Sequence, residues 1–277
     1  MSQGPWSHHS RNASVADDID FEVKGQELQF LEIELDPGES AVAEAGALVW
    51  KDASVEMTTV FGDGSGGAGG GFMGKLLGAG KRLVTGESLF TTVFTHQGQG
   101  KARVAFASPT PGAILPLKLS DVGGTLVCQK DSFLAAARGV SIGIAFQRKV
   151  MTGLFGGEGF IMQKLDGDGW VFVQMGGTIV ERELKAGEEL HVDTGCLAAY
   201  TPSVDFDLIM AGGVKTALFG GEGLFFARLR GPGKVWIQSL PFSRLAGRMM
   251  AAAGGGGQNR GEGSVLGGLG DLIGGNN

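Results

Sequence analysis

Three copies of one pattern run through this 277-residue chain and limit what it can fold into. Two copies contain nearly the same string, GLFGGEGFIMQKLDGDGWVFVQ from Gly153 and ALFGGEGLFFARLRGPGKVWIQ from Ala217. A looser copy, VTGESLFTTVFTHQGQGKARVAFA, begins at Val84. In each copy a glycine-rich turn separates two short apolar runs, which is the pattern of a β-hairpin. Because repeated units of this size bury their apolar faces against one another, the repeats predict a single β domain.

A second element precedes each copy in the same order. It begins at Leu35, Leu119 and Leu184, in the strings LDPGESAVAEAGALVW, LSDVGGTLVCQKDSFLAA and LKAGEELHVDTGCLAAY. A run with the two-residue alternation of a strand follows each of them. The first copy is longer than the other two, and its surplus is a glycine-rich insertion at 62–82. Since surface loops tolerate insertions, we expect this segment to be a loop.

The repeats predict an all-β fold in which three pseudo-equivalent antiparallel units, at about 21–108, 109–174 and 175–240, pack as one domain over 19–240. A β-sandwich and a double-stranded β-helix both fit this pattern. Composition separates the flanks into a polar, disordered leader at 1–18, a C-terminal helix at 241–253 and a flexible glycine-rich tail at 254–277. We expect Leu245, Met249 and Met250 of the helix to pack on the β domain.

Composition and charge exclude several classes of protein. The 51 glycines have no collagen period, and a 43% apolar content is too high for a wholly disordered chain. A net charge of −6 argues against nucleic-acid binding through a broad cationic face. Cys128 and Cys196 are too few for a disulfide framework and are expected to be buried, reduced thiols. With no signal, transit or transmembrane segment visible, we expect a cytoplasmic protein.

The LDPGESAVAEAGALVW element, the glycine-rich insertion and the two FGGEG strings together resemble the AIM24 family over residues from about 21 to 245. The resemblance implies a β-rich fold similar to that of the tryptophan RNA-binding attenuation protein. Eukaryotic members look mitochondrial, whereas bacterial members have no settled biochemical activity, so the resemblance supplies no catalytic residues. The missing transit-like leader favours the bacterial type. The chain also lacks the clustered Lys and Arg that RNA binding would need, and fold similarity alone does not transfer that function.

A search for catalytic and metal-binding motifs finds none that is complete. His191 and Asp193 supply the first half of an iron-binding facial triad, but no histidine follows them in the chain. We therefore predict no metal, no cofactor and no catalytic residue. The strongest remaining polar candidates are the repeat-equivalent carboxylates Glu87, Glu158 and Glu222. Around a pseudo-threefold axis they would converge on a cation; otherwise each pairs with a neighbouring base or caps a backbone N–H.

The insertion offers a second candidate surface. It mixes apolar and basic side chains, as segments that lie on anionic membranes or grip a protein partner do: Phe72, Met73, Lys75, Leu76, Leu77, Lys81 and Arg82. Its glycines weaken the case for a helix, and a loop whose leucines cover one end of the β core is the preferred interpretation.

These observations favour a non-enzymatic interaction or scaffold protein that self-associates through exposed sheet edges. The alternative is a small-ligand-binding protein with a pocket between repeat units. An enzyme without a recognisable motif is the third interpretation. Expected partners are a second copy of the chain and an unidentified protein, with peripheral membrane contact through the insertion and no nucleic acid.

Overall fold

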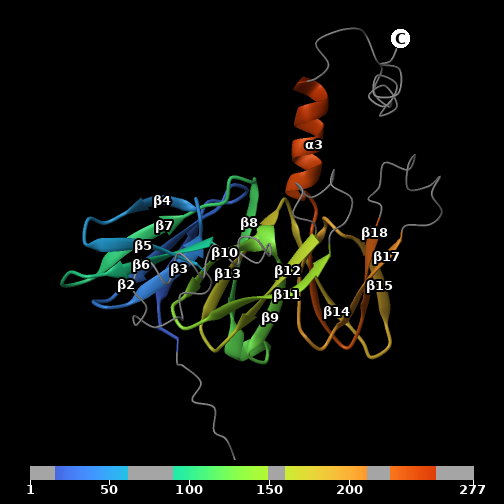
Figure 1. The fold of residues 1–277 in the computed structure, drawn as a ribbon, viewed down its shortest axis with the longest axis horizontal. Helices are drawn as coiled ribbons and strands as arrows, with labels where there is room; N and C mark the ends of the chain where they lie inside the picture. The colour runs from blue at the N-terminus through green and yellow to red at the C-terminus, as the bar shows by residue number, and fades with distance from the viewer. Residues whose placement is uncertain (1–15, 62–89, 149–159, 211–224, 254–277) are drawn as a thin grey trace, which may run out of the picture.

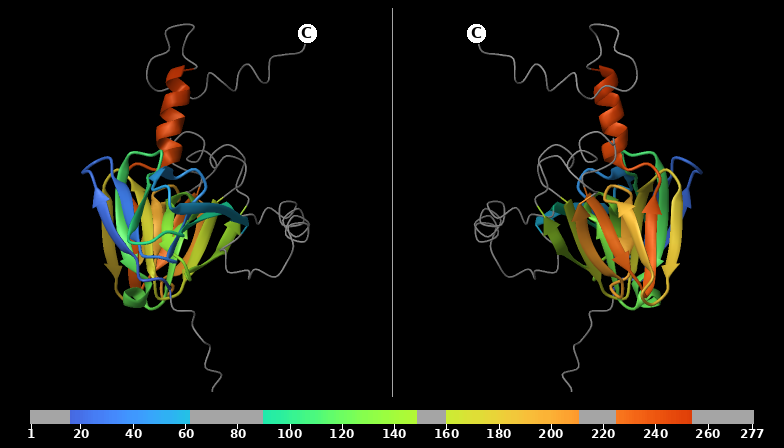
Figure 2. Two further views of the ribbon diagram at one scale, coloured as in Figure 1. Left: turned by 90° about the vertical axis from the view of Figure 1, so that its left-hand side faces the viewer. Right: turned by 90° about the vertical axis from the view of Figure 1, so that its right-hand side faces the viewer.

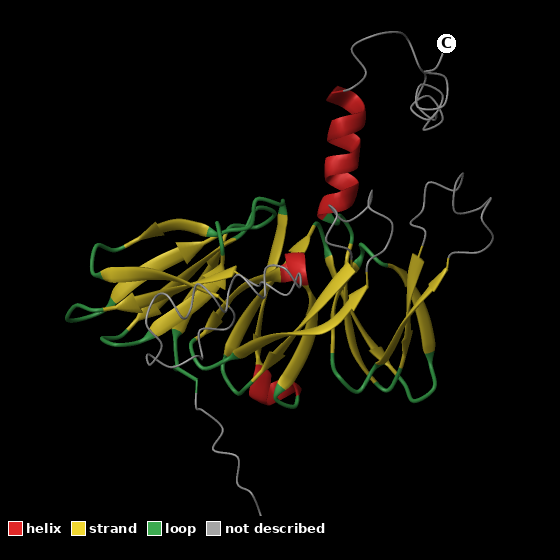
Figure 3. Ribbon diagram, viewed as in Figure 1, coloured by secondary structure: helices red, strands yellow, loops and turns green. Residues whose placement is uncertain are grey.

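A computed structural model describes residues 16–61, 90–148, 160–210 and 225–253 of the chain. These residues fold into four antiparallel sheets that follow one another in a row, from the blue strands at one end to the orange strands at the other (Figure 1). Strands dominate the described residues, and one helix, α3 (Phe242–Ala253), projects from the row (Figure 3). The all-β prediction with a C-terminal helix is confirmed.

Each repeat contributes six described strands, and their order is the same in all three. The first repeat has β2 (Phe30–Leu35), β3 (Ser40–Glu44), β4 (Leu48–Lys51), β5 (Val55–Phe61), β6 (Phe90–His96) and β7 (Ala102–Phe106), preceded by β1 (Asp20–Lys24). The second has β8 (Gly112–Lys118), β9 (Thr125–Gln129), β10 (Phe133–Ala137), β11 (Ser141–Arg148), β12 (Phe160–Asp166) and β13 (Trp170–Gly176), with the 3₁₀ turns η1 (Leu119–Val122) and η2 (Lys130–Ser132). The third has β14 (Ile179–Leu184), β15 (Glu189–Asp193), β16 (Leu197–Tyr200), β17 (Asp205–Met210), β18 (Phe225–Arg230) and β19 (Gly233–Gln238).

Every repeat is a small sandwich of two half-sheets. Its first, sixth and third strands form one half-sheet, and its fourth, fifth and second strands form the other. Neighbouring repeats are joined because the second strand of one pairs with the third strand of the next, as β3 does with β10 and β9 with β16. The result is sheet 1 (β1-β2-β7-β4), sheet 2 (β5-β6-β3-β10-β13-β8), sheet 3 (β11-β12-β9-β16-β19-β14) and sheet 4 (β15-β18-β17).

Three apolar cores lie between successive sheets. The first core joins Leu31 and Phe106 of sheet 1 to Phe172 of sheet 2, the second lies between sheets 2 and 3, and the third between sheets 3 and 4. Sheets 2 and 3 are therefore covered on both faces over much of their area. This explains why β10 (FLAAA) and β16 (LAAY) are continuous apolar runs and are buried throughout.

The predicted equivalence of the repeats is confirmed in detail. The three leucines that open the upstream element are fully or almost fully buried, as are the three apolar residues of the downstream copies: Leu35, Leu119, Leu184, Phe94, Leu165 and Leu229. The third strand of every repeat also carries a β-bulge at the same place, at Val49 in β4, Leu134 in β10 and Ala198 in β16. Because the register is shared, each residue of one repeat has a defined equivalent in the other two.

The predicted hairpins around the glycine turns are wrong. The turns after β6, β12 and β18 lead into β7, β13 and β19, but in each case the two strands lie in different sheets and do not pair. Instead, each turn connects a strand of one half-sheet to a strand of the opposite half-sheet. Alternating apolar residues suit a strand whether its successor lies beside it or across the core, so the pattern does not distinguish the two arrangements.

The expected packing of α3 is wrong for Met249 and Met250. Met249 and Met250 are 62% and 74% exposed, and the helix rises away from the sheets (Figure 2). The start of the helix is held, because Pro241 is buried, Leu245 is half-buried and Arg244 hydrogen-bonds to Asp193 at 3.2 Å. Helical spacing of apolar residues therefore did not indicate a contact with the β domain.

The end of the predicted leader is part of the fold. The backbone N–H of Ala16 donates to Asp168 Oδ1 at 3.0 Å, and that of Ser40 donates to Asp17 Oδ2 at 2.8 Å. Ala16 also packs against the first and second cores. The polar composition of the leader masked these local contacts, so the disorder predicted for 16–18 is corrected.

Cys128 of β9 lies fully buried in the second core, and this burial raises the pKa of its thiol to about 12. We expect a Cys196→Ser variant, which leaves Cys128 as its single thiol, to stay unreactive towards a thiol reagent at pH 8 until it is unfolded, because the thiolate is the nucleophile. Absorbance of the released chromophore in native buffer and in denaturant checks this. Rapid reaction of the native protein would contradict it.

Candidate functional site

The two sequence-predicted candidate sites lie outside the described residues. This holds for the carboxylates Glu87, Glu158 and Glu222 and for the insertion residues Phe72, Met73, Lys75, Leu76, Leu77, Lys81 and Arg82. Both stay predictions. The described strands do not close around a threefold axis, because the repeats form a row and no pairing within 16–61, 90–148, 160–210 and 225–253 joins the first repeat to the third.

His191 and Asp193 lie on β15 with local partners. The His191 ring shares a 2.8 Å hydrogen bond with Glu189, and Asp193 accepts the backbone N–H of Gly195 at 2.8 Å and a hydrogen bond from Arg244. Within the part of the chain that the structure describes, no three His, Cys, Asp or Glu side chains gather as metal ligands would. These residues are explained by local contacts on a half-exposed strand.

The feature that departs from the repeat symmetry is the apolar edge strand β4. Its Leu48, Val49 and Trp50 are 36%, 55% and 37% exposed. The residues in the same register of β10 and β16 are at most 3% exposed: Phe133, Leu134, Ala135, Leu197, Ala198 and Ala199. The preceding repeat covers β10 and β16, whereas no described strand pairs with the outer side of β4, so β4 leaves apolar side chains in solvent.

In the first repeat the large side chain of a cross-strand pair lies on the third strand, at Trp50, whereas the other repeats have it on the sixth strand. Trp50 lies directly opposite Ala105 of β7, whereas Ala135 lies opposite Phe172 and Ala199 opposite Trp236. Each pair therefore has one aromatic ring and one alanine on the same face. Phe172 and Trp236 are buried. Trp50 lies on the third strand of its repeat instead of the sixth, and its ring is 37% exposed.

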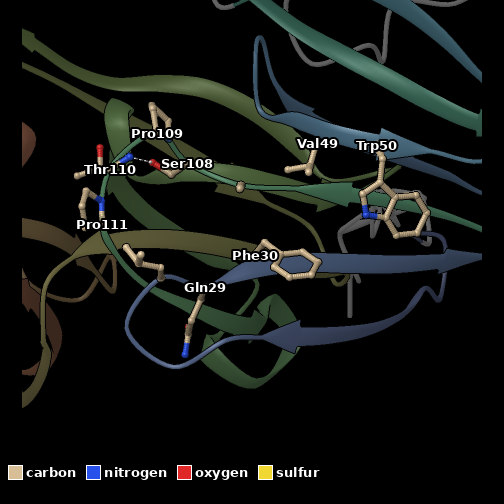
Figure 4. A pocket seen from close by; sticks show the side chains of 10 residues that line it. Gln29, Phe30, Val49, Trp50, Ser108, Pro109, Thr110 and Pro111 are labelled. Atoms are coloured by element: carbon tan, nitrogen blue, oxygen red, sulfur yellow. Dashed lines mark hydrogen bonds between the residues drawn. The ribbon is translucent and has the colours of Figure 1, made fainter.

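A hollow of about 350 Å³ adjoins Trp50. Val49 and Trp50 reach it from β4 and Phe30 from β2, and the link between the first and second repeats closes its far end with Ser108, Pro109, Thr110 and Pro111 (Figure 4). Leu28 also lines it and is largely exposed. We call Leu28, Phe30, Leu48, Val49 and Trp50 together the β4 surface.

Charged residues border the β4 surface on the outer face of sheet 1. Arg103 donates to Glu34 at 3.0 and 3.1 Å, and Lys24 lies 2.9 Å from Glu32. Hydrogen bonds from Lys101 first and Arg103 second lower the pKa of Glu34. An apolar centre with a charged border is the usual composition of a protein-binding surface.

The β4 surface was not predicted from the sequence, although the aligned repeats contain a signal for it. The third strand reads ALVW in the first repeat, SFLAA in the second and CLAAY in the third. Trp50 stands where the other two repeats have Ala135 and Ala199, and this large residue marks the first copy as different. Finding it requires knowing which strands face a neighbouring repeat.

Three sandwich units joined edge to edge place the chain in the class of repeat-built β proteins. A family model, Mitochondrial biogenesis AIM24, matches residues 21–240, and the chain belongs to this family. An uncharacterised protein of Streptococcus pyogenes serotype M6 is 30% identical over 230 residues, which cover 82% of this chain and 87% of the relative. A crystal structure of a Streptococcus pyogenes protein is similar with a TM-score of 0.67 and 25% identity, covering 84% of this chain and 99% of that one.

In the described part of the chain no helix has both the length and the apolar character needed to cross a bilayer.

Proposed function

We propose that this AIM24-family chain is a non-enzymatic interaction protein that binds other protein chains through the β4 surface. The observation that carries the proposal is the exposure of Leu48, Val49 and Trp50 where both other repeats bury the same positions. An unpaired strand offers backbone N–H and C=O groups to an incoming strand, and apolar side chains beside that edge add affinity. Trp is also the residue type most enriched among those that dominate binding energies.

The test introduces a charge into this surface. A tagged copy is expressed in the native cell beside the untagged chain, cross-linked and purified, and the captured proteins are quantified by mass spectrometry. We expect Val49→Asp to reduce the captured partners about tenfold or more, because the buried carboxylate would cost more than 1.4 kcal/mol of binding free energy. Met250→Asp, at a residue of α3 that is 74% exposed, is the control for an added surface charge. Equal capture by Val49→Asp and wild type would refute the proposal.

Binding of a small ligand is the second candidate, and the hollow beside Trp50 favours it. Its volume of about 350 Å³ falls at the lower end of the range of small-molecule sites. The hollow lies on the first repeat and its link to the second. Native mass spectrometry after incubation with a metabolite extract tests it: a ligand that binds wild type and not Trp50→Ala supports this function, and an unliganded spectrum rejects it.

A further inference from the structure

The joints between repeats inside the chain have one repeated geometry. The second strand of a repeat pairs antiparallel with the third strand of the next, as β3–β10 and β9–β16. The series ends at two strands of the same kinds. β4 is a third strand at the edge of sheet 1, β15 is a second strand at the edge of sheet 4, and no described strand pairs with their outer sides. They lie at opposite ends of the row (Figures 1 and 2).

We infer that β4 of one molecule pairs antiparallel with β15 of a second copy of this chain, head to tail. The inference rests on the proposed function and names its partner. The joined sheet would have the order β17-β18-β15-β4-β7-β2, which repeats the order of strand types in sheets 2 and 3. The new interface therefore continues a series whose two earlier members are present inside the chain.

The internal joints fix the register of this pairing. Ala135 faces Ala43 in the first joint and Ala199 faces Cys128 in the second, and the next pairs are Ala136 with Val42 and Tyr200 with Val127. The equivalent positions in β4 and β15 follow from their pairing with β7 and β18. They place Trp50 opposite Val192 of the second copy and Lys51 opposite His191.

The exposed side chains of β4 correspond to residues that enter the core of the preceding repeat. Leu134 and Ala135 belong to the second repeat but lie in the first core. Ala198 and Ala199 belong to the third repeat but lie in the second core. By the same rule, Val49 and Trp50 reach towards the third core of the second copy.

The other end of the molecule carries the matching apolar residue. Leu31, Leu115 and Val180 are equivalent, because they lie opposite Phe106, Val173 and Ile237. Leu31 shares the first core with Phe172, and Leu115 packs against the second core, which contains Trp236. Val180 is 44% exposed, and in the described residues sheet 4 has only β15, β18 and β17 and lacks the half-sheet that carries the ring in sheets 2 and 3. Trp50 of a second copy supplies that ring.

A head-to-tail contact occupies one end of each molecule and leaves the other end accessible. After the first contact the dimer still presents one β4 edge and one β15 edge, on different molecules, so association continues to a closed ring or an open filament. Polar pairing of Lys51 with His191 replaces the apolar pairs of the internal joints. We therefore expect an association that depends on protein concentration.

Intermolecular disulfide formation tests the register. In a Cys196→Ser background, Lys51→Cys chains are mixed with His191→Cys chains under mild oxidation, and the linked product is read on a non-reducing gel. Facing Cα atoms of antiparallel strands lie about 4.5–5.5 Å apart, within the Cα separation of disulfides, whereas diagonal positions two residues away lie about 7–8 Å apart. We expect at least about tenfold more linked dimer than from the mixture of Lys51→Cys with Glu189→Cys, which has the same exposed-strand chemistry two residues out of register.

The outcomes separate this inference from the proposed function. A linked dimer in the expected register that is lost on adding Val49→Asp to the Lys51→Cys chain supports it. Equal linking in both mixtures, or none, overturns it. If none forms while Val49→Asp still loses other captured proteins in the cell, the β4 surface binds a different chain and only the inference fails. If Val49→Asp captures the same proteins as wild type, both the inference and the proposed function fail.

Discussion

Replacing Trp236 with alanine is expected to lower the free energy of unfolding by about 3–5 kcal/mol. Trp236 is 1% exposed in the second core, and sheets 2 and 3 enclose it. Its indole N–H donates to Glu181 at 2.9 Å, and Glu181 keeps Lys234 as a partner at 2.8 Å when the ring is removed. The loss therefore comes from the cavity and from the lost burial, not from an orphaned carboxylate.

Trp50→Ala is the matched control, because it removes the same atoms from the equivalent strand pair at the end of the row. Chemical denaturation at low protein concentration, where the chain is dissociated, measures both variants. Since part of the Trp50 ring is already in solvent, we expect a loss of only about 1 kcal/mol there. Equal losses for the two variants would mean that the ring at Trp50 is as enclosed as that at Trp236, and the β4 surface would not exist.

The sequence predicted the repeated unit because burial constrains equivalent residues in the same way. Leu35, Leu119 and Leu184 end the first strand of each sandwich or follow it directly, and each is buried in its core. A polar residue there would leave a core open, so the leucines recur at matching places in the chain. Order and spacing of such anchors are visible in one sequence without any knowledge of the sheets.

The pairing of strands was not predictable from the same pattern. A strand such as β6 alternates in the same way whether the next strand lies beside it or across the core, so the hairpin prediction failed. The β4 surface depends on that pairing, because Val49 and Trp50 count as exposed only once β10 and β16 are known to be covered. The packing predicted for Met249 and Met250 was wrong for a related reason, because an apolar helix face does not indicate which surface it contacts.

Introducing an aspartate at Leu134 is expected to cost about 4 kcal/mol or more of the free energy of unfolding. Leu134 is the bulge residue of β10, 2% exposed, and it enters the first core from the second repeat. A carboxylate there would lose its hydration among apolar side chains. Because burial raises the pKa of a carboxyl group, the folded state binds the proton more tightly than the unfolded state, so the destabilisation should grow as the pH rises from 5 to 8.

Val49→Asp places the same charge at the equivalent bulge of β4, where the side chain is 55% exposed, and we expect the monomer to lose less than about 1 kcal/mol. Denaturant titrations at both pH values compare the two variants, and Leu134→Ala, expected to cost about 2–5 kcal/mol, covers the case in which Leu134→Asp does not fold. One substitution would then break the fold at an internal joint and leave it intact at the free end. If the two aspartates were equally tolerated, the joints between repeats would not be built around this position, and β4 could not be regarded as an uncovered copy of one.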